Sequence, residues 1–140
     1  EFMNGLSDKG EFVYTYHERI FKRWGNQVDK VIKLLSQSPN TRRALISLWD
    51  PKNDVESQTP PCLNMLWFCV REKKLECHVV YRSHHLATID SNGINVPGEG
   101  ALVPNLYAIY HLQKDIAEKT NLKLGPLILT DFSGHLYVCD

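Results

Sequence analysis

Cys62 is the residue whose surroundings are best suited to chemistry in this sequence of 140 residues. It follows Pro60 and Pro61 and stands at the start of an apolar run, Leu63–Val70. A proline pair restricts the backbone and supplies no amide hydrogens, so we expect the thiol at a fixed point where a loop enters a strand. A thiol held in this way is a candidate nucleophile.

Groups that bind phosphate stand beside two other strand-like runs. Arg82 and Ser83 close the next run along the chain, and Arg42 and Arg43 stand just before another. Guanidinium groups bind phosphate through several donors in one plane, and a hydroxyl adds a further hydrogen bond. Together with Cys62 these residues predict a cysteine nucleophile acting on a phosphorylated substrate. Taken singly, each has an ordinary interpretation as a buried thiol or a solvated surface residue.

The first half of the chain predicts one helix followed by three strands. Asn26 can cap a helix from Gln27 to about Gln37, in which apolar residues recur at helical spacing. The run Ala44–Trp49 is typical of a buried strand, and Leu63–Val70, apolar on both faces, is typical of a central strand. The alternating run Leu75–Arg82 should pair with this central strand as a hairpin.

The second half predicts a long loop over residues 86–103, then a helix from Pro104 to about Lys119. A final strand is expected over residues 127–131 and 135–138, with a break at Ser133-Gly134. These elements predict an α/β (α+β) fold in which helices cover one side of a mixed sheet. We assign residues 4–140 to one such domain and residues 1–3 to a cloning scar, because Glu1-Phe2 precedes Met3.

Charge and hydropathy exclude several classes of partner. Sixteen basic and sixteen acidic residues cancel, which argues against broad binding of nucleic acids or membrane surfaces. No apolar stretch approaches the roughly 20 residues of a membrane span. The cysteines show neither zinc-like spacing nor a disulfide framework, so we expect free thiols, no metal and a cytoplasmic setting. Adjacent side chains such as His84 and His85 rarely converge on one ion.

Five short segments, in this order and spacing, resemble thymidylate synthase and its relatives. The resemblance extends from about Tyr14 to Tyr137, which is nearly the whole sequence. It is strongest with the archaeal-type branch, in which Pro-Cys-Leu replaces the usual Pro-Cys-His. The segments are Arg42-Arg43, Pro61-Cys62, Tyr81-Arg82-Ser83, Asn105 and His135-Leu136-Tyr137.

The resemblance implies a specific use for the nucleophile. In the family, a cysteine thiolate adds to C6 of a pyrimidine ring, and C5 then attacks a one-carbon unit carried by methylenetetrahydrofolate. Cys62 corresponds to that thiolate. A nearby cation favours the ionised form of a thiol, so Arg82 is expected to assist Cys62 in catalysis.

The same resemblance implies how a pyrimidine nucleoside monophosphate would be held. Arg82 and Ser83 correspond to ligands of the 5′-phosphate. Arg42 and Arg43 correspond to a pair that reaches into the phosphate site of a neighbouring subunit, which implies a homodimer.

The resemblance also implies which residues contact the base and the sugar. Asn105 corresponds to the residue that contacts the pyrimidine edge, and an amide can both donate and accept as uracil requires. Relatives acting on deoxycytidylate usually carry aspartate there, so Asn105 favours a substrate of the uridylate type, such as dUMP. His135 and Tyr137 correspond to the pair that binds the sugar 3′-hydroxyl.

Departures from the family pattern leave the function open. Leu63 replaces a histidine, Tyr81 replaces a glutamine, and His85 replaces the aspartate that engages the folate pterin. His85 is therefore the candidate cofactor residue. The family's N-terminal portion, which carries a phosphate-binding loop and a proton-relaying glutamate, has no counterpart here. The sequence is compatible with a methyl- or hydroxymethyltransferase, with a non-catalytic nucleotide-binding or dimerisation module of a larger protein, and with a purely structural domain.

Overall fold

The computed structural model describes residues 4–6 and 12–139. The predicted cloning scar at residues 1–3 and the last residue of the predicted domain lie outside these described residues. Among the described helices, none has the length and apolar character that a membrane span requires.

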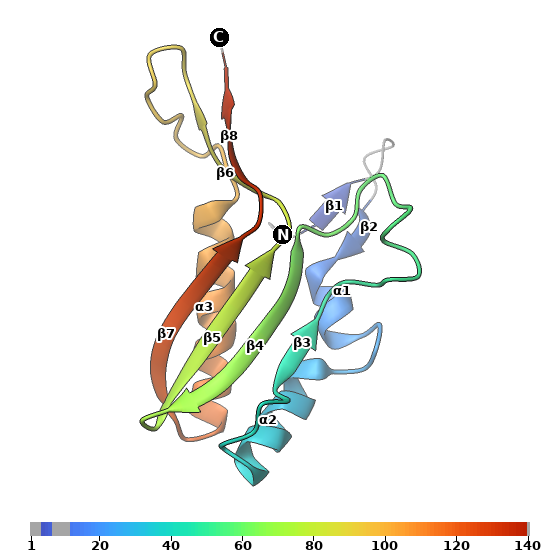
Figure 1. Ribbon diagram of the computed structural model, residues 1–140, viewed down its shortest axis with the longest axis vertical. Coiled ribbons are helices and arrows are strands. Elements are labelled where there is room, and N and C mark those ends of the chain that lie inside the picture. Colours follow the sequence, from blue (N-terminus) through green and yellow to red (C-terminus); the bar gives the residue numbers. More distant parts are fainter. Residues whose placement is uncertain (1–3, 7–11, 140) are drawn as a thin grey trace.

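A four-stranded mixed sheet in the order β3-β4-β5-β7 forms the centre of the fold (Figure 1). Its strands are β3 (Leu45–Ser47), β4 (Leu63–Arg71), β5 (Lys74–Tyr81) and β7 (Lys123–Asp131). The first three pair antiparallel, whereas β7 runs parallel to β5 after a helical crossover. The predicted hairpin of β4 and β5 is confirmed.

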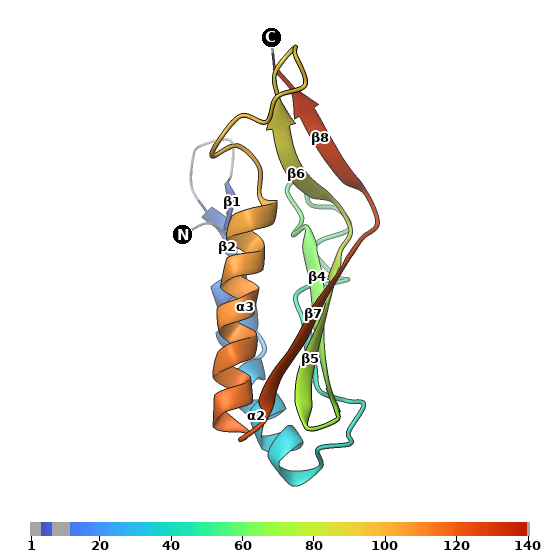
Figure 2. The same cartoon turned by 90° about the vertical axis from the view of Figure 1, so that its left-hand side faces the viewer.

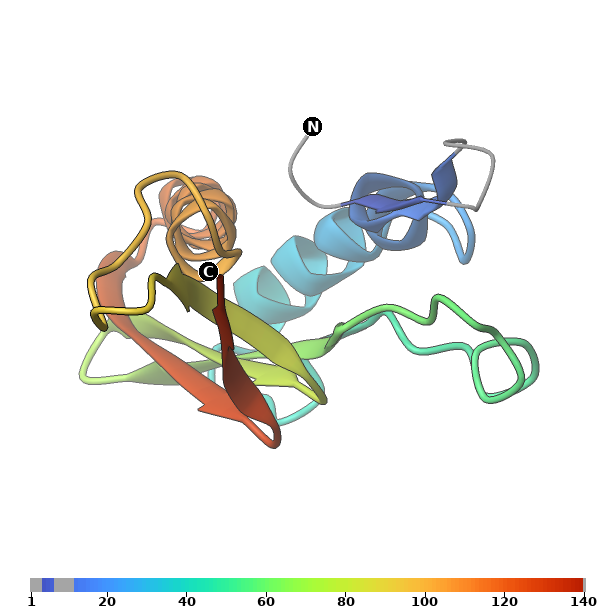
Figure 3. The same ribbon diagram turned by 90° about the horizontal axis from the view of Figure 1, so that it is seen from above.

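The helices α1 (Tyr16–Phe21), α2 (Gln27–Gln37) and α3 (Leu102–Lys119) lie on one side of this sheet (Figures 2 and 3). Helix α2 spans the predicted residues, and the Asn26 side chain caps it by accepting a hydrogen bond of 3.1 Å from the Asp29 amide. The other side of the sheet, which we call the open face, is covered by none of the described helices.

Two smaller ribbons extend the fold. Strands β1 (Asn4–Leu6) and β2 (Phe12–Thr15) pair antiparallel, and β6 (His84–Ile89) pairs parallel with β8 (Gly134–Val138). The β6–β8 ribbon continues beyond the ends of β5 and β7, so it projects from one end of the central sheet (Figure 1).

The core lies between the helices and the sheet. Every second residue of β5 is buried on that side, and α2 and α3 contribute the opposing layer. The predicted α+β fold, with helices on one side of a mixed sheet, is therefore confirmed. Core residues that are no more than 2% exposed include Leu35, Ile46, Leu66, Phe68, Leu75, Val79, Ile109 and Ile116.

The structure corrects several boundaries. The predicted loop over residues 86–103 is shorter, because its first residues belong to β6 and α3 already begins at Leu102. The predicted final strand is two strands in different sheets, and the strand expected at Ala44–Trp49 is limited to β3. Helix α1 was not predicted, since six residues carry too little periodicity.

Candidate functional site

Cys62 and Arg82 lie side by side where β4 begins and β5 ends. The Arg82 amide donates a hydrogen bond of 2.9 Å to the Cys62 carbonyl oxygen. Arg82 Nε donates to the carbonyl oxygen of Pro61 at 3.0 Å, and Nη2 donates to that of Pro60 at 2.7 Å. These carbonyls are free because the residues lie before the start of the sheet ladder. The guanidinium is thereby fixed against the segment that carries the thiol.

A buried ion pair anchors the loop that leads to Cys62. Arg19 on α1 pairs with Asp54, and the two side chains are only 4% and 3% exposed. Arg19 Nη2 donates to Asp54 Oδ1 at 2.8 Å, and Arg19 Nη1 also donates to the Leu48 carbonyl oxygen at 2.7 Å. Asp54 Oδ2 accepts from the Asp50 amide at 2.7 Å. Short helix α1 therefore helps to position the thiol, although it carries no candidate site residue.

Tyr81 lies on the core side of the same strand ends. Burial raises the pKa of Tyr81 well above its ordinary value, and the nearby Tyr16, Asp131 and Cys62 side chains raise it further. Its hydroxyl oxygen is buried and finds no hydrogen-bond partner among the described residues. The Cys62 side chain is half-buried.

His84 connects two candidate segments through a buried network that the sequence did not predict. Its Nδ1 donates to Asp131 Oδ1 at 2.9 Å, and its Nε2 accepts from Asn105 Nδ2 at 3.1 Å. The ring stacks on Tyr81 with a centroid separation of 4.1 Å. Asn105, which is expected to contact the pyrimidine base, is buried, with an exposed fraction of 5%. Through His84 it is joined to the segment that carries Arg82.

His85, His135 and Tyr137 come together on the β6–β8 ribbon. The His85 ring centroid lies 5.9 Å from that of His135 and 4.5 Å from that of Tyr137. His85 Nε2 also lies 3.0 Å from Thr88 Oγ1. The candidate sugar-binding pair and the candidate cofactor residue therefore form one aromatic cluster.

Arg42 and Arg43 are exposed and lie far from Cys62 in the same chain. The Arg42 carbonyl oxygen accepts from Trp67 Nε1 at 3.0 Å. Trp67 lies five residues beyond Cys62. At a rise of about 3.3 Å per residue, this separation amounts to roughly 17 Å. Ser83 is half-buried and directly follows Arg82.

A groove of about 370 Å³ opens on the open face beside Arg82. Its other walls are mostly apolar, and Cys62 is not among the residues that line it. The arginine is the charged group of this groove, so an anionic ligand would be held there by its guanidinium. The lining residues are Leu45, Ser47, Trp49, Asn64, Met65, Arg82 and Phe132.

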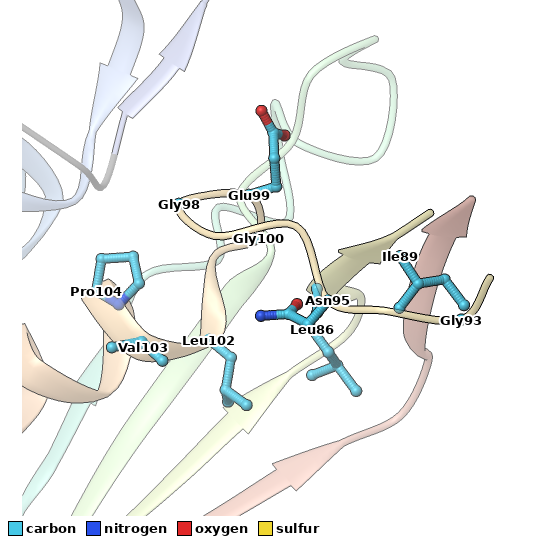
Figure 4. A pocket seen from close by; sticks show the side chains of 11 residues that line it. Leu86, Ile89, Gly93, Asn95, Gly98, Glu99, Gly100, Leu102, Val103 and Pro104 are labelled. Carbon is cyan, nitrogen blue, oxygen red and sulfur yellow. The ribbon is translucent and has the colours of Figure 1, made fainter. Parts of the chain in front are cut away.

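A second cavity of about 730 Å³ lies between β6, the following loop and the start of α3 (Figure 4). Leu86 and Leu102 point to the same side of this loop, whereas Glu99 points away from them (Figure 4). Its walls combine glycine backbone and apolar side chains with the polar residues Asn95 and Glu99. Because Glu99 points away from the two leucine side chains, the cavity offers mainly packing surface.

Comparison with known proteins gives one consistent result. The family described as thymidylate synthase matches residues 2–139. Three archaeal proteins provisionally named thymidylate synthase are similar to this chain. The protein of Methanothermobacter marburgensis is 33% identical over 131 residues, which cover 93% of this chain and 53% of that protein.

The other two relatives give similar values. The protein of Methanopyrus kandleri is 34% identical over 128 residues, covering 90% of this chain and 56% of its own length. That of Methanocaldococcus jannaschii is 31% identical over 140 residues, covering 93% and 58%. The chain thus spans about half the length of the curated relatives it matches.

Proposed function

The chain belongs to the thymidylate synthase family, and from this premise we propose that it transfers a one-carbon unit to C5 of a uridylate-type nucleoside monophosphate. The observation that carries the proposal is the fixation of Arg82 by the two carbonyl groups preceding Cys62. The Cys62 thiolate adds to C6 of the pyrimidine, which makes C5 nucleophilic. The guanidinium is held against the segment that carries this thiol.

The 5′-phosphate is proposed to bind at Arg82 and Ser83. Arg82 has five N–H donors, of which the carbonyl groups of Pro60 and Pro61 engage only part. The remaining donors can form charge-assisted hydrogen bonds with phosphate oxygens.

Base and sugar are proposed to contact Asn105, His135 and Tyr137. His84 engages the amide nitrogen of Asn105, which leaves the amide oxygen to accept a hydrogen bond from N3 of a uracil ring. His135 and Tyr137 project from the β6–β8 ribbon and supply polar groups for the 3′-hydroxyl.

Methylenetetrahydrofolate, when bound, supplies the one-carbon unit. The residues present are compatible with a pterin, because His85 can donate or accept a hydrogen bond and the aromatic cluster of His85, His135 and Tyr137 offers ring faces for stacking. His85 is therefore the proposed cofactor contact.

A homodimer is proposed to cover the open face. Leu45, Ile128 and Phe132 are 42%, 39% and 73% exposed there, and an apolar sheet face normally packs against another layer. In a two-fold interface each subunit presents the same surface to the other. Arg42 and Arg43 at one end of β4 can then reach the Arg82 groove of the partner at the other end.

Release of the C5 hydrogen of dUMP, measured with methylenetetrahydrofolate in the full-length gene product, tests this function. We expect turnover in the wild type and in Cys139→Ser, whose thiol is exposed, and no turnover in Cys62→Ser. Turnover that persists in a folded Cys62→Ser protein would contradict the proposed nucleophile.

The engagement of Asn105 by His84 favours a second candidate, a nucleotide-binding module without catalysis. His85 in place of the family's aspartate points the same way. Calorimetry separates the two candidates. Binding of dUMP that is unchanged by Cys62→Ala, with no product at any concentration, supports the module.

A further inference from the structure

Three potential metal ligands meet on the open face of the hairpin, well away from Cys62. Cys69 pairs directly with Glu76 across β4 and β5, and His78 lies two residues further along β5. Side chains two residues apart in a strand project from the same face. Cys69 Sγ, Glu76 Oε2 and His78 Nε2 all lie within 4.8 Å of one another.

The separations of these atoms match the edges of a zinc coordination tetrahedron. Cys69 Sγ lies 3.6 Å from Glu76 Oε2 and 3.9 Å from His78 Nε2, and the last two atoms are 3.3 Å apart. With Zn–S near 2.3 Å and Zn–N or Zn–O near 2.1 Å, tetrahedral angles give edges of about 3.6 Å from sulfur and about 3.4 Å between nitrogen and oxygen.

Hydrogen bonding accounts less well for this geometry. Glu76 Oε2 is approached by His78 Nε2 and by Arg71 Nε, each at 3.3 Å, as well as by Cys69. Charge-assisted hydrogen bonds between nitrogen and carboxylate are usually about 2.7–2.9 Å long. Both nitrogen–oxygen contacts are longer than this, so hydrogen bonds alone do not account for the close approach of the three ligand atoms.

We propose that Cys69, Glu76 and His78 bind one Zn²⁺ ion, with water as the fourth ligand. This departs from the expectation of no metal drawn from the sequence. Thiolate, imidazole and carboxylate suit zinc or cobalt, whereas magnesium and calcium select oxygen ligands. On binding, the Cys69 thiol releases its proton to solvent and a Zn–S bond forms, without any change of oxidation state.

The surroundings provide both access and a means of detection. A cleft of about 190 Å³, lined in part by Cys69, Arg71 and Trp67, opens beside the cluster and gives an ion a path from solvent. The Trp67 ring centroid lies 5.1 Å from that of His78, so a paramagnetic ion at the site should quench Trp67 fluorescence. The ion would join β4 to β5 close to their turn.

Titration of the chelator-treated protein with Co²⁺ tests the proposal. The wild type should bind one ion per chain with a thiolate-to-cobalt charge-transfer band, the visible bands of tetrahedral cobalt, and quenched fluorescence. Zn²⁺ should then abolish the visible bands. Cys69→Ser and His78→Gln should each weaken binding by more than about a hundredfold, beyond the loss typical of outer-shell changes.

Matched variants make the test specific. Cys139→Ser and His111→Gln alter exposed residues of the same types and should leave binding unchanged. Arg71→Gln removes an exposed cation that competes for Glu76, so binding should tighten. A folded wild type without the thiolate band, a band that persists in Cys69→Ser, or weaker binding in Arg71→Gln would overturn the proposal. The wild-type spectrum decides the matter even if a ligand variant fails to fold.

Discussion

The four cysteines lie in different environments, and these environments determine how reactive each thiol is. Cys77 is fully buried, and burial raises the pKa of its thiol to about 12. Burial also raises the pKa of Cys69. Cys62 is half-buried at the end of a loop, and Cys139 is exposed. Cys77 is therefore the thiol that the core shields from reagents in the native state.

We predict selective alkylation at the residue scale. At pH 7 only about one Cys77 thiol in 10⁵ is ionised at a pKa of about 12, and the core shields it. Iodoacetamide should label Cys139 and Cys62 and leave Cys77 unlabelled, as peptide mass spectrometry can measure. Cys77 should become labelled in denaturant. Native labelling of Cys77 at the rate of Cys139 would contradict the assigned burial.

His84 should matter for stability, because it is 1% exposed and its ring joins Asp131 to Asn105. Replacing it with alanine leaves the buried Asn105 amide and the half-buried Asp131 carboxylate without this partner. We expect His84→Ala to lower the free energy of unfolding by roughly 2–4 kcal/mol, at about 1–3 kcal/mol for each unsatisfied group. Urea denaturation measures this loss. The exposed His111→Ala variant serves as the control and should change stability by less than about 0.5 kcal/mol.

Local signals made some elements predictable and left others hidden. The Asn26 cap and the helical spacing identify α2, and the apolar runs identify β4 and β5. Strand β6 pairs in parallel with β8, almost fifty residues later, and no local pattern encodes such a partner. The loop anchor Arg19–Asp54 was hidden for the same reason.

The proximity of the proposed zinc ligands Cys69, Glu76 and His78 could have been predicted from the sequence. Glu72 and Lys73 form a two-residue turn in which both residues adopt positive φ angles, 50° and 61°. A turn of this length fixes the register of the hairpin. Pairing of Cys69 with Glu76 follows from that register, and His78 shares the face of Glu76. By contrast, the contact of His84 with Asn105 could not be inferred, because it joins a strand to the start of a distant helix.

At the element scale, the loop before Cys62 should depend on Asp54. Removing one partner of a buried ion pair leaves a buried charge without compensation, at a cost of roughly 3–5 kcal/mol. Asp54→Asn should therefore destabilise the fold by this amount in denaturant unfolding. Glu56→Gln changes an exposed carboxylate of the same loop and serves as the control. Equal stabilities of the two variants would show that Arg19 does not anchor the loop.

At the scale of the whole molecule, two facts determine what can be proposed. None of the described helices covers the open face of the sheet, and the chain spans about half the length of the relatives it matches. The open face carries Ile128, 39% exposed, whereas the outer surface of α3 carries Tyr107, 67% exposed. Both are apolar, but only the first lies on the surface proposed to pair. Ile128→Lys should therefore yield monomers in sedimentation velocity, and Tyr107→Lys should not. Dissociation by both variants, or by neither, would argue against pairing through the open face.

The proposed sharing of sites between subunits has its own signature. When each variant is assayed by itself, neither Cys62→Ser nor the Arg42→Ala, Arg43→Ala double variant should convert dUMP. Mixed dimers should regain activity, because the arginine variant supplies Cys62 and its partner supplies the arginines. Activity that stays absent after verified subunit exchange would place Arg42 and Arg43 outside the phosphate site.

The most direct test of the central claim is intact-protein mass spectrometry after incubation with 5-fluoro-deoxyuridylate and methylenetetrahydrofolate. Fluorine at C5 cannot leave as a proton does, so a nucleophile added to C6 remains attached. We predict a covalent adduct in the full-length gene product, mapped to the peptide that contains Cys62 and absent from Cys62→Ala. A folded, nucleotide-binding protein that forms no adduct, or one that forms it on another cysteine, would contradict the account.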